Sequence, residues 1–132
     1  MKVFLDTSAI IAFLNKDDIF NQHAYHTFKS TIEKGSALIT TDYIVIETVT
    51  ILKNRIGIEA VRAFDDEMLP VISVLWIDKK LHDTALSNLL YSGHRKISLV
   101  DFTSFEAMRK SGITHAFTFD KHFKTMGFTI LS

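Results

Sequence analysis

The chain has 132 residues, of which 47% are apolar, and this is enough for one domain with its own buried core. It contains no cysteine, which excludes disulfides, thiolate metal sites and cysteine nucleophiles. The 15 basic and 15 acidic residues balance. Any nucleic acid must therefore be held by a local basic patch or through metal ions, not by overall charge.

No stretch of the sequence approaches the roughly 20 apolar residues that a membrane span requires. The N-terminal run Met1–Leu14 is interrupted by Asp6, Thr7 and Ser8, and it lacks the basic and apolar regions of a signal peptide. Together with the absence of cysteine, these features predict a cytoplasmic protein without a membrane partner. No linker, low-complexity tract or repeat divides the chain, so we expect a single domain over residues 1–132.

The hydrophobic periodicity predicts short strands that alternate with longer helices. In chain order we expect a strand at Lys2–Leu5, helices at Thr7–Leu14 and Asn21–Lys34, a strand at Ala37–Ile39, helices at Asp42–Arg55 and Ile58–Met68, a strand at Val71–Ile77, helices at Lys80–Leu90 and Leu99–Lys110, and strands at Ala116–Phe119 and Phe128–Leu131. This alternation is typical of an α/β protein with a mainly parallel sheet covered on both faces. Ligands of such sheets collect at the carboxyl ends of the strands.

Two aspartates directly follow predicted strands, Asp6 after Lys2–Leu5 and Asp120 after Ala116–Phe119. Each is expected at the carboxyl edge of the sheet. Aspartate is also a common helix N-cap or turn residue, and for either one alone that role is the favoured interpretation. A functional interpretation therefore depends on further acids that reach the same edge.

Glu47 is the only charged residue between Asp42 and Lys53, in a helix that is apolar almost all round. We expect such a helix to be largely buried. A buried carboxylate without a partner is costly, and no lysine or arginine stands at helical spacing from Glu47. A bound cation would explain this residue; a salt bridge to a distant base and a narrow exposed polar seam are the alternatives.

Asp101 lies in the segment Ser98-Leu99-Val100-Asp101, which has the pattern of a capping box with Ser98 as the N-cap. Stabilisation of a helix start could therefore be the whole role of Asp101. The two roles are compatible, because the acidic first turn of a helix also faces the sheet edge.

Four carboxylates in one pocket would repel each other and need a counter-charge. Oxygen ligands suit Mg²⁺ or Mn²⁺ better than zinc. Such ions can clamp a phosphodiester, activate a water and stabilise the leaving oxygen. Ser8, which follows Asp6 by two positions, could orient a ligand or a metal-bound water, or could be an ordinary helix-start hydroxyl.

The segments that carry these acids resemble the PIN-domain family. The opening resembles the start of PIN domains in Val3-Phe4-Leu5-Asp6-Thr7-Ser8-Ala9, and Glu47 stands in an apolar helix after a short strand, as in the family. Three further segments resemble the C-terminal half of PIN domains: Ser98-Leu99-Val100-Asp101, Thr118-Phe119-Asp120-Lys121-His122-Phe123 and Gly127-Phe128. The resemblance covers essentially the whole chain, although the segment Asp17–His23 departs from the usual pattern.

This resemblance implies a three-layer α/β/α sandwich and an endoribonuclease that depends on Mg²⁺ or Mn²⁺. The acidic positions of the family correspond to Asp6, Glu47, Asp101 and Asp120, which would be both catalytic and metal-binding. Asp120 could orient a water instead of binding metal directly. Domains of this length resemble the VapC-like toxins of toxin–antitoxin pairs, which implies an RNA substrate, an antitoxin partner and a homodimer.

Three alternatives remain open. A phosphatase of the haloacid-dehalogenase type also places an aspartate after its first strand, but it needs a second acid where this chain has Ser8. A PIN-like module could bind RNA or a protein without catalysis. An α/β interaction domain could use all four acids as caps and surface charges. Two basic pairs flank the predicted pocket and could contact phosphates, although isolated pairs are usually solvated surface: Arg95 with Lys96, and Lys121 with Lys124.

Overall fold

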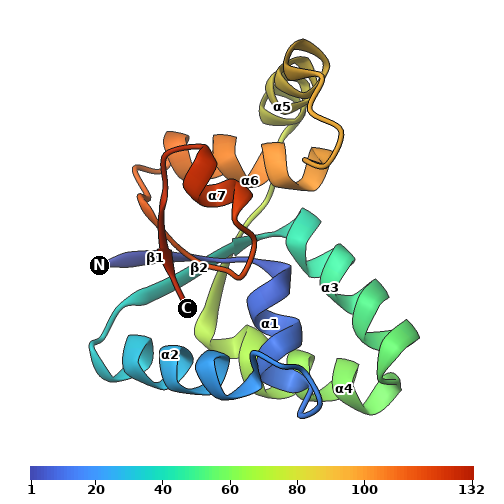
Figure 1. The fold of residues 1–132 in the computed structure, drawn as a ribbon, viewed down its shortest axis with the longest axis vertical. Helices are drawn as coiled ribbons and strands as arrows, with labels where there is room; N and C mark the ends of the chain where they lie inside the picture. The colour runs from blue at the N-terminus through green and yellow to red at the C-terminus, as the bar shows by residue number, and fades with distance from the viewer.

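The computed structural model describes residues 1–132 as a five-stranded parallel sheet between two sets of helices (Figure 1). The strands are β1 (Lys2–Leu5), β2 (Ala37–Thr41), β3 (Ile72–Leu75), β4 (His115–Phe117) and β5 (Thr129–Leu131). The helices are α1 (Thr7–Leu14), α2 (Asn21–Glu33), α3 (Asp42–Arg55), α4 (Ile58–Ala63), α5 (Lys79–Ser92), α6 (Leu99–Lys110) and α7 (His122–Thr125). A π-helical turn at Phe64–Met68 and a 3₁₀ turn at Leu69–Val71 connect α4 to β3.

The order of the strands is β3-β2-β1-β4-β5. The chain therefore moves outward from β1 through β2 and β3, and then returns to the other side of β1 for β4 and β5. This reversal makes the carboxyl ends of β1 and β4 the topological switch point, where open α/β sheets bind ligands. The two ends are level, because Leu5 pairs with Phe117.

Helices cover both faces of the sheet, with α1, α2 and α4 on one side and α6 and α7 on the other (Figure 1). Twenty-five buried residues form one hydrophobic core, to which β1 contributes Val3, Phe4 and Leu5 without any exposed surface. On the side of α6 and α7, the ring of Phe105 packs against the rings of Phe123 and Phe128, with centroids 5.0 and 5.7 Å apart. The predicted sandwich with a parallel sheet is confirmed.

Three helices have the predicted bounds, namely Thr7–Leu14, Asp42–Arg55 and Leu99–Lys110. The helix predicted at Ile58–Met68 is α-helical only to Ala63 and continues as a π-helical turn that buries Phe64 and Met68. The strand predicted at Ala116–Phe119 ends at Phe117, so Asp120 does not follow it directly. The short helix α7 was not predicted.

The expectation that α3 is buried on nearly all sides is wrong. Only Ile44, Thr48 and Leu52 are buried in this helix, and Ile46 is 65% exposed. The helix packs along one face and leaves the other open, which places Glu47 at an intermediate depth. None of the helices combines the length and the apolar character needed to cross a bilayer.

Candidate active site

Asp6 lies at the switch point, where its backbone N–H still donates to the carbonyl of Phe117 at 3.1 Å. The residue occupies the N-cap position of α1, yet its side chain does not cap the helix. The residue is only 4% exposed. The N-cap role therefore does not account for this side chain.

Two hydroxyl groups hold the Asp6 carboxylate instead. Thr118 Oγ1 donates to Asp6 Oδ2 at 2.8 Å, and Ser8 Oγ donates to the same oxygen at 2.9 Å. In turn, the Thr118 hydroxyl accepts the backbone N–H of Asp120 and the Ser8 hydroxyl accepts that of Phe119, each at 2.9 Å. This network ties the chain after β4, as far as Asp120, to the carboxylate at the end of β1.

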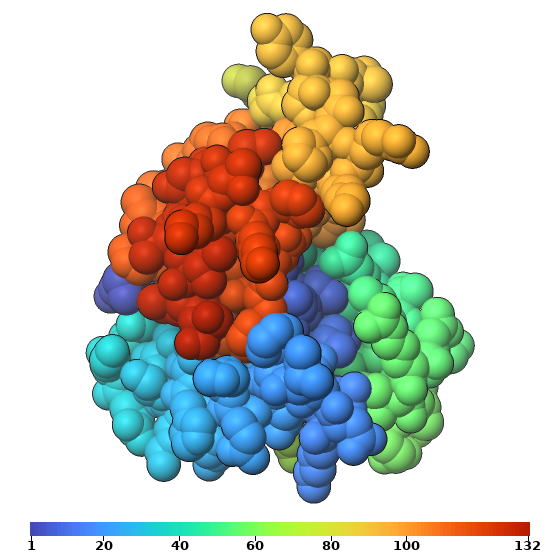
Figure 2. Space-filling model, viewed as in Figure 1, coloured from blue at the N-terminus to red at the C-terminus, as the bar shows by residue number.

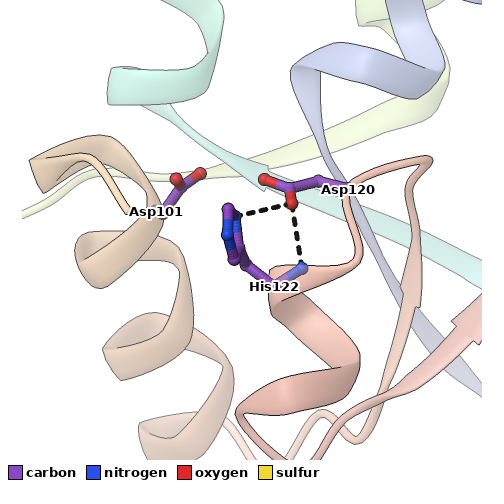
Figure 3. A group of neighbouring side chains, drawn as sticks. All are labelled: Asp101, Asp120 and His122. Carbon is purple, nitrogen blue, oxygen red and sulfur yellow. Dashed lines mark hydrogen bonds and ion pairs between the residues drawn. The ribbon is translucent and has the colours of Figure 1, made fainter. Parts of the chain in front are cut away.

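Asp101 forms the predicted capping box of α6. Its Oδ2 accepts the Ser98 N–H at 3.0 Å, and the Ser98 Oγ accepts the Asp101 N–H at 3.1 Å. Asp120 accepts the His122 N–H through Oδ1 at 2.9 Å, in a tight turn ahead of α7. Figure 3 shows Asp101 and Asp120 approaching each other from α6 and from the loop before α7, with the His122 ring between them.

One pocket of about 430 Å³ brings the predicted residues together, a size in the usual range for ligand sites. All five predicted site residues are among those that line it: Asp6, Ser8, Glu47, Asp101 and Asp120. Phe20, Phe119 and Asp18 are also in the lining, and Arg55 is its only basic residue. The pocket therefore holds far more negative than positive charge.

The carboxyl groups influence one another in this pocket. Burial raises the pKa of Asp6 to about 6; the Thr118 and Ser8 hydrogen bonds oppose the rise, and the charges of Asp101 and Asp120 add to it. Burial also raises the pKa of Asp101, against the hydrogen bonds from Ser98 and with further increases from Asp120 and Glu47. A cation among these groups would relieve both the burial and the repulsion.

The donor set fits a hard divalent cation, because carboxylate oxygens dominate it. Ligand atoms of Asp101, Asp120 and His122 lie within 4.8 Å of one another. The Nδ1 atom of His122 is buried and lies 2.9 Å from Asp120 Oδ1, but it makes no hydrogen bond. His122 is the first residue of α7 and lies beside the acids.

Sequence reasoning did not identify Thr118, Phe20 or Arg55. A signal for Thr118 exists, because a hydroxyl two positions before Asp120 mirrors Ser8 two positions after Asp6. Arg55 reaches the pocket because it lies at the end of α3, and no local sequence pattern predicts that position.

Known proteins resemble this chain both in sequence and in fold. Residues 3–129 match the PIN domain family. The 23S rRNA-specific endonuclease VapC20 of Mycobacterium tuberculosis is 34% identical over 127 residues, which cover 96% of this chain and 95% of the relative. The crystal structure of that protein, described as a sarcin–ricin loop cleaving toxin, superposes with a TM-score of 0.86 at 33% identity and covers 96% of each chain.

Two more distant structures share the fold. VapBC2 from Rickettsia felis, bound to a DNA fragment from its promoter, gives a TM-score of 0.73 at 14% identity and covers 98% of this chain and 97% of the other. FitAcB from Neisseria gonorrhoeae gives 0.71 at 16% identity, with 100% and 97% covered. Sequence and structure together show that this chain belongs to the PIN-domain family and is a homologue of VapC toxins.

Proposed function

We propose that the protein is an endoribonuclease whose Asp6, Glu47, Asp101 and Asp120 hold Mg²⁺ or Mn²⁺. The observation that carries this proposal is that all four side chains line one pocket, where burial raises the pKa of Asp6 to about 6. A pocket that keeps an acid so far from its ordinary pKa is a candidate functional site. When bound, the metal would polarise the phosphodiester and lower the pKa of an attacking water.

The chain's own residues would prepare the site for this chemistry. Ser8 and Thr118 fix the Asp6 carboxylate through Oδ2, which directs the remaining oxygen to a ligand. The capping box fixes the Asp101 carboxylate on the first turn of α6 in the same way. Asp120, held by the backbone N–H of His122, either binds the metal or orients the water.

The substrate class is RNA under this proposal, and a structured ribosomal loop is the first candidate. The support is the relative of 34% identity, a 23S rRNA-specific endonuclease. We also propose that the protein is the toxin of a toxin–antitoxin pair, that it acts in the cytoplasm, and that it forms a homodimer held by an antitoxin. The VapBC structure supports the antitoxin by its fold alone.

The experiment is RNA cleavage by the purified protein with Mg²⁺, Mn²⁺ or EDTA. The substrates are a hairpin that carries the sarcin–ricin loop and an unstructured oligoribonucleotide. Asp6→Asn and Asp101→Asn should each lower the rate at least ~100-fold, because each removes a charged metal ligand. Asn at position 101 can still accept the Ser98 N–H, so this variant should keep its helix cap and its stability.

Asp66→Asn is the matched control, because Asp66 is exposed and does not line the pocket. It should cleave like the wild type. Wild-type protein that cuts no RNA with either metal, and that binds no metal in a calorimetric titration, would contradict the proposal. RNA binding without metal binding would favour the alternative of a non-catalytic PIN-like module.

A further inference from the structure

We propose that Phe20 and Phe119 form a stacking platform for one unpaired nucleobase of the RNA, beside the carboxylate pocket. The inference rests on the proposed ribonuclease function and adds a residue that positions the substrate. Phe20 lies in the loop between α1 and α2, and Phe119 lies between β4 and Asp120. The two rings come from opposite ends of the sequence and meet at the pocket.

The two rings are stacked, with centroids 4.6 Å apart and planes inclined by 9°. Phe20 nevertheless remains 40% exposed. Both residues line the pocket that contains Asp6 and Asp120. An exposed aromatic ring at the rim of an otherwise strongly acidic pocket offers an apolar contact next to the position where a phosphodiester would bind.

Hydrogen bonds hold the backbone that carries both rings. Asp18 Oδ1 accepts the Phe20 N–H at 2.8 Å, and the Asn21 side chain donates to the carbonyls of Ala12 and Phe13 at 2.8 and 3.1 Å. These bonds tie the loop to the end of α1. The Phe119 N–H donates to Ser8 Oγ, which itself donates to Asp6. The platform is thus connected directly to the carboxylate network, and little ordering remains to be done when a ligand binds.

A nucleobase is the occupant that suits this arrangement. Proteins recognise single-stranded RNA by stacking unpaired bases on aromatic side chains, next to groups that hold the backbone. Arg55, the one cation in the pocket lining, can meet a phosphate there. If the Phe20 ring served only to pack the loop, an aliphatic side chain would replace it without loss for the substrate.

The same chain offers a control for aromatic exposure alone. Tyr25 is 49% exposed and is stacked on Phe13, with planes inclined by 8° and centroids 6.4 Å apart. Tyr25 does not line the carboxylate pocket. Tyr25→Ala therefore removes a comparable ring from a place where the proposal assigns no base.

The test measures RNA cleavage by the wild type and by Phe20→Ala, Phe20→Leu, Phe20→Trp and Tyr25→Ala. The RNA set contains the parent oligoribonucleotide and versions in which one nucleotide near the mapped cleavage site is replaced by an abasic one. Phe20→Ala should lower kcat/KM by ~5- to 100-fold, mainly through KM, which is the range for loss of one base–aromatic stack. Phe20→Leu should lose nearly as much, whereas Phe20→Trp and Tyr25→Ala should stay close to the wild type.

The abasic series gives the decisive comparison. One abasic position should cost the wild type the same factor as Phe20→Ala and should cost Phe20→Ala little more, because both changes remove the same contact. Anisotropy with the same labelled RNAs in Ca²⁺, another hard cation for oxygen ligands, supplies a second readout that needs no cleavage.

The outcomes separate the two proposals. If the wild type cleaves RNA and every abasic substitution affects wild type and Phe20→Ala alike, the platform is refuted and the ribonuclease stands. If RNA binds without cleavage but follows the expected abasic pattern, the platform stands and the ribonuclease falls. If the wild type neither binds nor cleaves RNA, both are refuted.

Discussion

Asp6 is subject to two opposing demands. Its burial at the end of β1 raises its pKa to about 6, whereas the hydroxyls of Thr118 and Ser8 favour its charged form. Without a cation, the charged carboxylate costs folding free energy, because its pKa in the folded chain exceeds the ordinary value of 3.8. Under the proposed function, this cost in stability is the cost of holding a carboxylate in place for a metal ion.

The cost can be measured with Asp6→Asn in the absence of metal. The raised pKa destabilises the wild type as pH increases from about 3.8 to about 6, and the full cost, about 3 kcal/mol at most, is present above that range. Asn removes the charge and keeps an acceptor for the two hydroxyls, so the variant should melt roughly 3–10 °C higher than the wild type at neutral pH. The advantage should vanish as pH falls towards 4, and thermal scans at several pH values in EDTA would measure it.

If the proposed metal binding holds, Mg²⁺ or Mn²⁺ should reverse this order, because the metal would stabilise the wild type more than the variant. Asp66→Asn, at an exposed site, should leave the melting temperature nearly unchanged at every pH. A lower melting temperature for Asp6→Asn at neutral pH in EDTA would mean that the carboxylate mainly holds the fold together.

The acids could be identified from the sequence because each stands at a recognisable place: after a strand, in a capping box, or alone in an apolar helix. That they share one pocket could be established only from the strand order, because the reversal at β1 is what brings the ends of β1 and β4 together. Phe20 and Arg55 could not be identified in this way, because no local sequence pattern connects them with the four predicted acids, and packing alone brings them to the pocket. The catalytic and metal-binding roles of the four acids stay predictions.

Among the helices and strands, the bounds of the long elements with a clear apolar period were predicted best. Helices α1, α3 and α6 have the expected bounds, and their apolar spacing matches the pattern in the sequence. Capping side chains, of Thr41 and Ser98, also mark where α3 and α6 begin. Helix α7 has only the four residues His122–Thr125, too short for any periodicity, and forms because the turn at Asp120 and the burial of Phe123 hold it. Strand β4 is shorter than predicted, because the N–H groups of Phe119 and Asp120 donate to the hydroxyls of Ser8 and Thr118 and not to a neighbouring strand.

Helix α5 is the least supported of the long helices, and it projects from the rest of the molecule (Figures 1 and 2). Ala85 is its only buried residue, whereas α6 buries six. We expect the backbone amides of α5 to exchange with deuterium well before those of α6, because local opening exposes little apolar surface. Asn88→Ala should speed exchange further in α5 alone, since Asn88 donates to Glu106 of α6 at 2.9 Å.

Mass spectrometry at two protein concentrations would check this expectation and control for association. Leu90 and Tyr91 are 71% and 95% exposed on α5, so a second copy of the chain could cover them. Protection of α5 that increases with concentration would report such a homodimer. Equal protection of α5 and α6 in dilute protein would contradict the weak attachment of α5.

At the scale of the whole molecule, the balance of 15 basic and 15 acidic residues limits what overall electrostatics can do. A ribonuclease with no net charge gains little attraction for RNA from its surface as a whole. Its pocket even adds repulsion, because five acids line it with one arginine. Under the proposed function, the metal would supply the local positive charge that the chain does not carry.

This reasoning predicts an unusual pair of dependences for RNA binding. Between about 50 and 200 mM salt, affinity should fall by no more than roughly tenfold, because few lysines and arginines displace counterions from the phosphates. Chelation of the divalent metal should cost at least as much. Anisotropy titrations with a labelled oligoribonucleotide would measure both, with Asp66→Asn as a control that changes net charge without touching the pocket. A steep salt dependence that survives EDTA would show that a basic surface, such as one assembled between two copies of the chain, holds the RNA instead of the carboxylate-bound metal.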